Sequence, residues 1–249
     1  ALGKDVLVAM VADGTPPPAL YLDALAAVAQ DANLAPAFRA LALGLPSQDD
    51  IAQTQADAGH TPDPTEIHRA SEAVAVALAQ RLQDILPGLR AEMVVPGAYT
   101  PDATAAGKRA LGQTALSLTS RLDGGAAAVT EFEAADNMTQ SLGAWGCLLR
   151  LGKAEAQSAA FYARWKADRL VMDKWFGMQI ALAPPEEAVA VANALAGHAD
   201  FDWRNPNRFR SVLGALAGNA AGFHDSSGAG YAFLADWLIK LDPVNPQTT

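Results

Sequence analysis

The chain has few of the residues on which disulfide-stapled, membrane-spanning or nucleic-acid-binding proteins depend. Cys147 is its single cysteine, which rules out an internal disulfide framework and fits a reducing cytoplasm. No uncharged run of about 18 apolar residues is present, which argues against a membrane span. The 18 basic and 27 acidic residues give a formal net charge of -9, which argues against sequence-independent binding to the phosphate backbone of nucleic acids. The sequence therefore predicts neither a membrane nor a nucleic acid as a partner.

The N-terminal sequence ALGKDVLVAM also lacks the basic start and the cleavage site of a signal peptide. Because the chain begins with Ala1 rather than methionine, we expect it to be a piece of a longer polypeptide. Its 249 residues, 51% of them apolar, are enough for one large domain or two modest ones. We expect a single domain over residues 1–249, with subregions of about 1–122 and 123–249.

Nearly every segment carries apolar residues at helical spacing, and the connectors are short and rich in Pro, Gly and Asp. The best strand candidate, AEMVVPGAY, contains Pro96 and Gly97, which count against a strand. No period repeats cleanly, so regular tetratricopeptide or ankyrin arrays are excluded. The sequence predicts an all-α fold, either a bundle or an irregular array of antiparallel helix pairs. Helices are predicted at residues 16–30, 35–43, 48–55, 65–86, 101–121, 125–133, 136–151, 153–170, 172–182, 185–196, 206–217 and 228–241.

Candidate nucleophiles and metal ligands are few. Cys147 lies among apolar residues of a predicted helix, where a buried structural thiol is expected rather than a reactive one. His68 and Glu72 share a helix face at i, i+4, but no H-E-x-x-H motif occurs. A surface side-chain pair is the favoured interpretation of these two residues.

Three further features have ordinary structural explanations. His224 precedes Asp225, which could orient its imidazole, but a histidine at a helix C-terminus is the favoured interpretation. The stretch SSGAGYAF lacks the preceding strand and third glycine of a nucleotide-binding loop, and a serine that caps the final helix explains it. Asp173 interrupts an aromatic stripe, so we expect it to cap a helix whose Trp175 and Phe176 pack inward.

An arginine cluster in WRNPNRFRSVLGALAG, residues 203–218, is not explained in this way. Arg204, Arg208 and Arg210 surround a predicted helix start at which Asn205 is the expected N-cap. Cations at this end of a helix face the positive end of its dipole, which disfavours them by about a few tenths of a kcal/mol.

Two interpretations of the cluster stay open on spacing alone. The arginines could pair with Asp200 and Asp202 just upstream. Alternatively, guanidinium groups and helix amides together could bind an anionic group. Neither a general base nor a metal ligand accompanies the cluster, so chemistry on a bound group could not be completed there.

Three long motifs resemble the C-terminal region of the bacterial aminopeptidase N type of zinc metallopeptidase, and they occur in that family's order. A fourth stretch, AFRALALGLPSQDDIA, is similar to the region before them, where family members have a comparable Leu-Pro-Ser turn. The resemblance therefore covers nearly the whole chain. The three motifs are EFEAADNMTQSLGAW, RLVMDKWFGMQIA and NPNRFRSVLGALAGNAAGFHDSSGAGYAFLADWLIKLDPVNPQ.

This resemblance implies a multi-domain enzyme of which only the end is present. The family's zinc-binding H-E-x-x-H and substrate-binding G-A-M-E-N motifs do not occur here, so zinc and the catalytic residues would lie upstream of Ala1. The resemblance thus implies no metal, cofactor or catalytic residue in this fragment, which we expect to be inactive alone. It also implies a right-handed superhelix of HEAT- or armadillo-like helix pairs. Because family members continue with further helices, we expect the closing turn at Thr249 to be truncated.

The resemblance further implies that this domain covers the catalytic domain of the parent enzyme and narrows access to its cavity. We expect Asn205, Asn207, Arg208 and Arg210 to face this channel. Arg208 is the leading candidate to attract the free carboxylate of a short peptide substrate.

Two other classes of function are weighed against this one. The first alternative is a free-standing helical-repeat scaffold that binds proteins along a concave face. A helical small-molecule enzyme using Asp173 and His224 is the more remote alternative.

Overall fold

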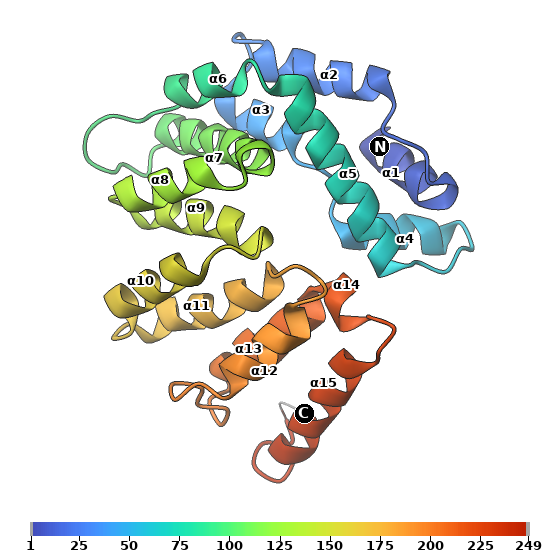
Figure 1. Ribbon diagram of the computed structural model, residues 1–249, viewed down its shortest axis with the longest axis vertical. Coiled ribbons are helices and arrows are strands. Elements are labelled where there is room, and N and C mark those ends of the chain that lie inside the picture. Colours follow the sequence, from blue (N-terminus) through green and yellow to red (C-terminus); the bar gives the residue numbers. More distant parts are fainter. Residues whose placement is uncertain (1, 248–249) are drawn as a thin grey trace. The chain divides into compact units, whose positions relative to one another are not determined.

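The computed structural model describes residues 2–247, so residues 1, 248 and 249, with the closing turn expected at Thr249, lie outside the described residues. Within residues 2–247 the chain forms fifteen α-helices and no β-strand, which confirms the all-α prediction (Figure 1). The strand candidate AEMVVPGAY is instead the end of one helix and part of a loop. None of the described helices combines the length and the apolarity needed to cross a bilayer.

The chain divides into two compact units, Ala1–Leu148 and Leu149–Thr249. Unit 1 contains α1 (Leu2–Asp13), α2 (Ala19–Gln30), α3 (Pro36–Leu43), α4 (Gln48–Asp57), α5 (Pro64–Leu82), α6 (Leu86–Glu92), α7 (Ala103–Asp123), α8 (Ala126–Ala134) and most of α9 (Met138–Arg150). Unit 2 contains α10 (Glu155–Trp165), α11 (Arg169–Ala181), α12 (Ala188–Ala196), α13 (Pro206–Gly218), α14 (Ala220–Phe223) and α15 (Ala229–Leu241).

The boundary between the units follows Leu148, whereas the sequence suggests subregions that meet near residue 122. The reason is the turn between α7 and α8. Gly124 and Gly125 adopt left-handed φ angles of 65° and 96°, which glycine tolerates and other residues disfavour. This turn lets α8 fold back onto α7, so the residues beyond 122 remain in unit 1.

Unit 1 is built around its two longest helices, α5 and α7, which pack against each other. The helices α1, α2 and α4 pack on α5, while α3, α6 and α8 pack on α7. Each helix buries one apolar face. Along α5 that face includes Ile67, Val74 and Leu78, which recur at the helical period and are almost fully buried.

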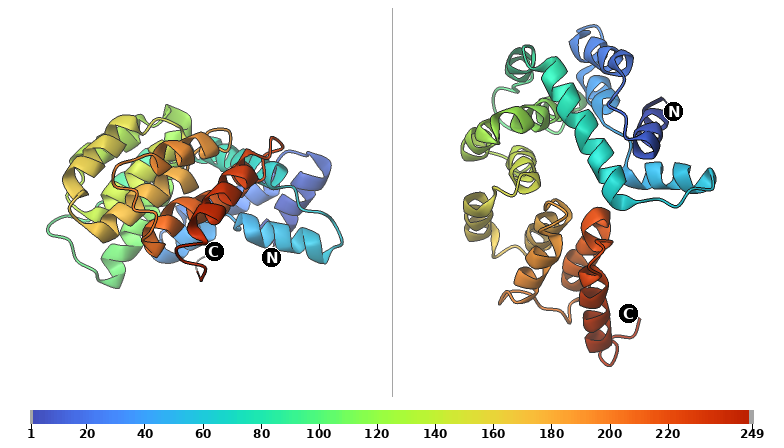
Figure 2. Two further views of the ribbon diagram at one scale, coloured as in Figure 1. Left: turned by 90° about the horizontal axis from the view of Figure 1, so that it is seen from below. Right: turned by 45° about the vertical axis from the view of Figure 1, so that its right-hand side comes forward.

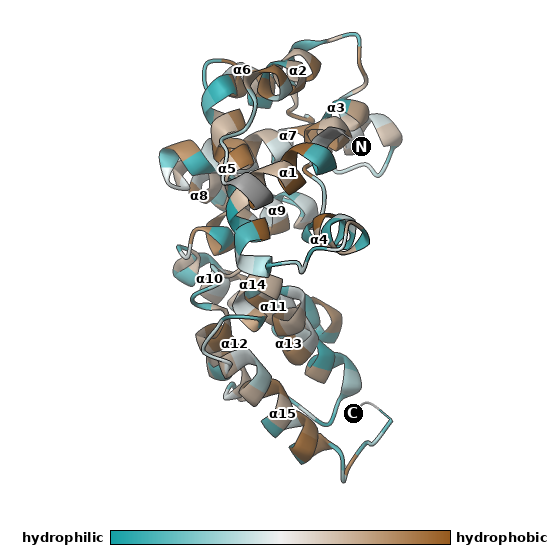
Figure 3. Ribbon diagram, turned by 90° about the vertical axis from the view of Figure 1, so that its right-hand side faces the viewer, coloured by the Kyte–Doolittle hydropathy of each residue, from teal (hydrophilic) through white to brown (hydrophobic). Residues whose placement is uncertain are grey.

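Unit 2 is built around α11, α12 and α13, which pack against one another. Figures 1 and 2 show these helices side by side in orange. Gly177 of α11 allows a close approach to α13, because an added Cβ would lie 3.3 Å from the carbonyl oxygen of Ser211. Trp175 and Phe176 are buried in this core, as predicted. In Figure 3 brown and teal segments alternate along the helices, which is typical of helices with one buried face.

Twelve predicted helices correspond to observed ones, but α1, α6 and α14 were not predicted. The prediction that Asp173 caps a helix is wrong, because α11 already begins at Arg169. Asp168 is its N-cap and accepts hydrogen bonds from the backbone N–H groups of Leu170 and Val171 at 3.0 and 3.1 Å. Asp173 therefore lies inside the helix, where it is free to pair with another element.

Candidate functional site

The candidate site in unit 2 begins at the start of α13, which the sequence predicts correctly. Asn205 is the N-cap, and its side-chain oxygen accepts hydrogen bonds from the backbone N–H groups of Asn207 (3.0 Å) and Arg208 (3.5 Å). Pro206 occupies the first helical position, where its fixed φ suits the helix. This start turns Arg208 and Phe209 inward and leaves Asn207 and Arg210 exposed.

The Arg208 side chain is buried, with only 9% of it exposed. Its Nε donates to Oδ1 of Asp173 at 2.6 Å, and the two side chains form an ion pair between α13 and α11. Its Nη1 donates to the carbonyl oxygen of Asp200 at 2.6 Å, and its Nη2 donates to that of Arg169 at 3.4 Å. The guanidinium also lies 4.7 Å from the ring centroid of Phe176. Each guanidinium nitrogen therefore has an acceptor inside unit 2.

These contacts bear on the two interpretations of the arginine cluster. Arg208 does pair with an acid, but that acid is Asp173 on α11 rather than the upstream carboxylate of Asp200 or Asp202. The other arginines differ from Arg208. Arg204 is exposed and stacks on Trp203, with its Cζ 4.3 Å from the ring centroid, and Arg210 is exposed on α13.

The loop before α13 is held by a chain of polar contacts around Asp200. The backbone N–H of Asp200 donates to Nδ1 of His198 at 3.1 Å, and the hydroxyl of Tyr162 donates to its carboxylate at 2.7 Å. This hydrogen bond from Tyr162 to Asp200 raises the pKa of the tyrosine. The His198 ring packs among Tyr162, Trp175 and Phe176, with centroid separations of 5.2, 5.2 and 5.7 Å.

A cavity of about 480 Å³ opens beside this loop, within the size range of small-molecule sites. It offers cations from Lys166 and Arg169 and carboxylates from Asp200 and Asp202. Such a surface can bind charged groups, but it brings no activated nucleophile next to a general base. The residues that line it are Lys166, Arg169, Met172, Ala199, Asp200, Asp202, Asn205 and Arg208.

The remaining candidates do not line this cavity. Cys147 is buried, as expected. His68 and Glu72 do not share a ligand, because Nδ1 of His68 contacts Nε2 of Gln48 at 3.2 Å while Glu72 pairs with Arg121 at 2.8 Å. Among the described residues, no three His, Cys, Asp or Glu side chains are grouped so that they could hold a metal ion.

His224 contacts Tyr231 rather than Asp225, the partner that the sequence suggests. Its Nδ1 lies 2.6 Å from the hydroxyl of Tyr231 on α15, and both residues are exposed. The carboxylate of Asp225 instead accepts from the backbone N–H of Ser227 at 2.9 Å. The contacts with Ser227 lower the pKa of Asp225. Among the described residues of unit 2, Asp173 pairs with Arg208 and His224 pairs with Tyr231, so the two residues share no hydrogen-bond partner.

A family model described as a domain of unknown function (DUF3458_C) with ARM repeats matches residues 1–249. The chain belongs to this ARM-repeat family. The armadillo-like character of the predicted fold is thereby confirmed for the DUF3458_C domain.

Two relatives of this DUF3458_C domain are aminopeptidases. Aminopeptidase N of Caulobacter vibrioides is 39% identical over 234 residues, and aminopeptidase N of Escherichia coli is 33% identical over 236 residues. Each match covers 92% of this chain but only 26% of the relative, so the chain spans about a quarter of these proteins. The resemblance to aminopeptidase N drawn from the three motifs is confirmed.

A solved structure has the same fold. The crystal structure of Legionella pneumophila aminopeptidase A in complex with aspartic acid superposes with a TM-score of 0.85 at 26% sequence identity. The match covers 99% of this chain and 30% of that chain.

Proposed function

We propose that this chain is the C-terminal helical domain of a cytoplasmic zinc aminopeptidase that removes N-terminal amino acids from peptides. In this role it covers the catalytic domain of the same polypeptide and restricts the channel through which peptides reach the catalytic centre. The observation that supports the proposal is the similarity to aminopeptidase N along 92% of the chain. No residue of this chain is assigned to zinc, because the described side chains form no suitable group of ligands. The metal would supply Lewis-acid chemistry from the remainder of the parent polypeptide.

The four residues expected at the channel differ in whether their polar groups are already engaged within unit 2. The three guanidinium nitrogens of Arg208 already donate inside unit 2, and the side-chain oxygen of Asn205 caps α13. Asn207 and Arg210 are exposed and three residues apart, so they lie on one side of the helix. We therefore assign the contact with a peptide carboxylate to Arg210, with Asn207 beside it, and a positioning role to Arg208 and Asn205.

The activity itself is tested with the parent polypeptide and with this chain alone. The parent protein is expected to release N-terminal residues from alanyl peptides and to lose this activity on treatment with a zinc chelator. The purified 249-residue chain is expected to release none, even with added zinc. Release of amino acids by the isolated chain, or an inert parent protein, would contradict the proposal. The scaffold alternative predicts that the reading frame upstream of Ala1 encodes no zinc motif.

The role of Arg210 is tested in the parent enzyme with Ala-Ala-Ala and its C-terminal amide. Arg210→Ala is expected to lower kcat/KM for the free acid roughly tenfold, since a hydrogen bond between charged groups contributes about 1.5 kcal/mol or more. The amide carries no carboxylate and is expected to be hydrolysed as fast as by the unaltered enzyme. Arg164→Ala, at an exposed arginine of α10, is the matched control and should leave kcat/KM unchanged for both substrates. Equal losses of kcat/KM for the acid and the amide would contradict a contact between Arg210 and the substrate carboxylate.

A further inference from the structure

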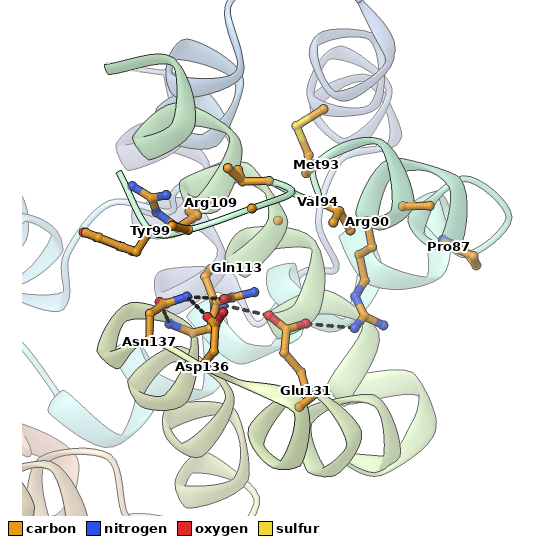
Figure 4. Close-up of a pocket in the computed structure, with 17 residues that line it drawn as sticks. Pro87, Arg90, Met93, Val94, Tyr99, Arg109, Gln113, Glu131, Asp136 and Asn137 are labelled. Carbon is orange, nitrogen blue, oxygen red and sulfur yellow. Dashed lines mark hydrogen bonds and ion pairs between the residues drawn. The ribbon is translucent and has the colours of Figure 1, made fainter. Parts of the chain in front are cut away.

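Unit 1 contains a cavity of about 570 Å³ that the proposed function does not use. It lies between α6, the loop of residues 94–102, α7 and the junction of α8 with α9 (Figure 4). Its volume falls within the range of about 300–1,000 Å³ that is typical of small-molecule sites. The motif EFEAADNM, which no step of the proposed function requires, contributes Glu131, Ala134, Asp136 and Asn137 to its lining.

Arg109, on α7, is the main chemical feature of this cavity. The residue lines the cavity yet is only 8% exposed. Its Nη2 donates to the carbonyl oxygen of Thr100 at 2.6 Å, and its Cζ lies 4.3 Å from the ring centroid of Tyr99. Among the described residues no carboxylate forms an ion pair with it, in contrast to Arg90, Arg121 and Arg208. A guanidinium keeps its charge in proteins, and a buried charge without a counterion is costly.

The two acids that line the cavity do not supply this counterion. Glu131 accepts from Nη2 of Arg90 and from Nε2 of Gln113, both at 3.0 Å, so its charge is compensated (Figure 4). Asp136 is exposed and accepts from Nδ2 of Asn137 at 2.9 Å. The charge of Arg109 is therefore available to an anion that enters the cavity.

The remainder of the lining determines what such an anion can carry. Met93, Val94 and Val95 line the cavity from the end of α6 and the following loop. Val94 is 63% exposed, although a large apolar side chain gains from removal from water. A ligand with an apolar tail could cover this surface.

We propose that this cavity binds a small organic carboxylate with a short apolar tail. The carboxylate pairs with the guanidinium of Arg109, whose planar fork of N–H donors matches the two carboxylate oxygens. The tail packs against the apolar side formed by residues 93–95. This inference rests on the geometry of unit 1 alone and holds whether or not the parent protein is an aminopeptidase.

The test is a titration of the ¹⁵N-labelled 249-residue chain with three probes, monitored by the NMR signals of the Gly97 and Gly112 amides, which line the cavity. N-acetyl-L-leucine and 4-methylpentanoate both carry the carboxylate and the branched tail, and both are expected to bind with millimolar Kd or tighter. L-leucinamide keeps the tail but replaces the carboxylate with a neutral amide and adds an ammonium group, and it is expected not to bind. The absence of shifts with both acids at about 10 mM, or equal shifts with L-leucinamide, would overturn the proposal.

Variants assign the binding to this cavity. Arg109→Gln is expected to weaken both acids at least about tenfold, whereas Arg164→Gln in unit 2 should leave them unchanged. Ala98→Trp places a large ring at an exposed lining position without altering Arg109, and it is expected to abolish binding. If Arg109→Gln does not fold, Ala98→Trp decides the question. Undiminished binding of the acids by a folded form of either variant would show that they bind outside this cavity.

Discussion

Replacement of Arg208 by alanine is expected to lower the free energy of unfolding of unit 2 by about 3–5 kcal/mol, because it breaks a buried ion pair and leaves one partner behind. Asp173 would lose the guanidinium that lies 2.6 Å from it while only 23% of its side chain is exposed. The carbonyl oxygens of Asp200 and Arg169 would lose a donor as well. The loss should appear as a lower denaturant midpoint.

Tryptophan fluorescence is a suitable probe for this measurement, since four of the five tryptophans, at positions 165, 175, 203 and 237, belong to unit 2. Arg210→Ala is the matched control, because this arginine lies two residues further along the same helix and is exposed. Its effect should stay within about 0.5 kcal/mol. A stability of Arg208→Ala close to that of the unaltered chain would mean that Arg208 does not hold α11 and α13 together.

Replacement of Asn219 by alanine is expected to cost about 2–4 kcal/mol for a different reason, namely the loss of hydrogen bonds to buried backbone groups. Asn219 is only 8% exposed, at the junction of α13 and α14. Its Nδ2 donates to the carbonyl oxygens of Ile180 and Ala183 at 3.0 and 2.9 Å, and its Oδ1 accepts from the N–H of Gly222 at 3.3 Å. The carbonyl oxygen of Ile180 would still accept from the N–H of Ala183 at 3.3 Å. The main cost therefore comes from the carbonyl oxygen of Ala183 and the N–H of Gly222, which lose their hydrogen bonds to Asn219.

Asn193 offers the matched control for this variant. It is exposed on α12, and its Nδ2 donates to the carbonyl oxygen of Val189 one turn earlier at 2.9 Å. Asn193→Ala should change the stability by no more than about 0.5 kcal/mol, in the stabilising direction, because alanine has the higher helix propensity. Chemical denaturation of both variants provides the comparison. Equal stabilities of Asn219→Ala and Asn193→Ala would show that the junction does not depend on the Asn219 amide.

The stability prediction for Arg208 and the kinetic prediction for Arg210 separate two roles that the sequence leaves combined. If Arg208 holds the start of α13 in place, its loss should also disturb the position of Arg210 in the parent enzyme. Arg208→Ala is then expected to affect both stability and kinetics, while Arg210→Ala affects only the kinetics of substrates with a free carboxylate. The kinetics of Arg208→Ala alone therefore do not identify a substrate contact.

The sequence by itself determined the all-α fold, the start of α13 at Asn205 and Pro206, and the inward packing of Trp175 and Phe176. These features depend on the helical period and on caps, which involve residues within a few positions of each other. The resemblance to aminopeptidase N could likewise be drawn from the sequence, because three long motifs carry it. The signals for α6 and α14 were too weak, since α6 has Pro87 and Gly88 in its first turn and α14 has only four residues.

Only the tertiary structure decided what the arginines contact. Arg208 and Asp173 are 35 positions apart, and the packing of α13 on α11 brings them together. Arg109 gives no signal in its own segment, because its significance comes from burial beside a cavity without a carboxylate partner. Local preference selects helices within a few residues, whereas the partner of a buried charge depends on which helix faces meet, and that choice belongs to the whole fold.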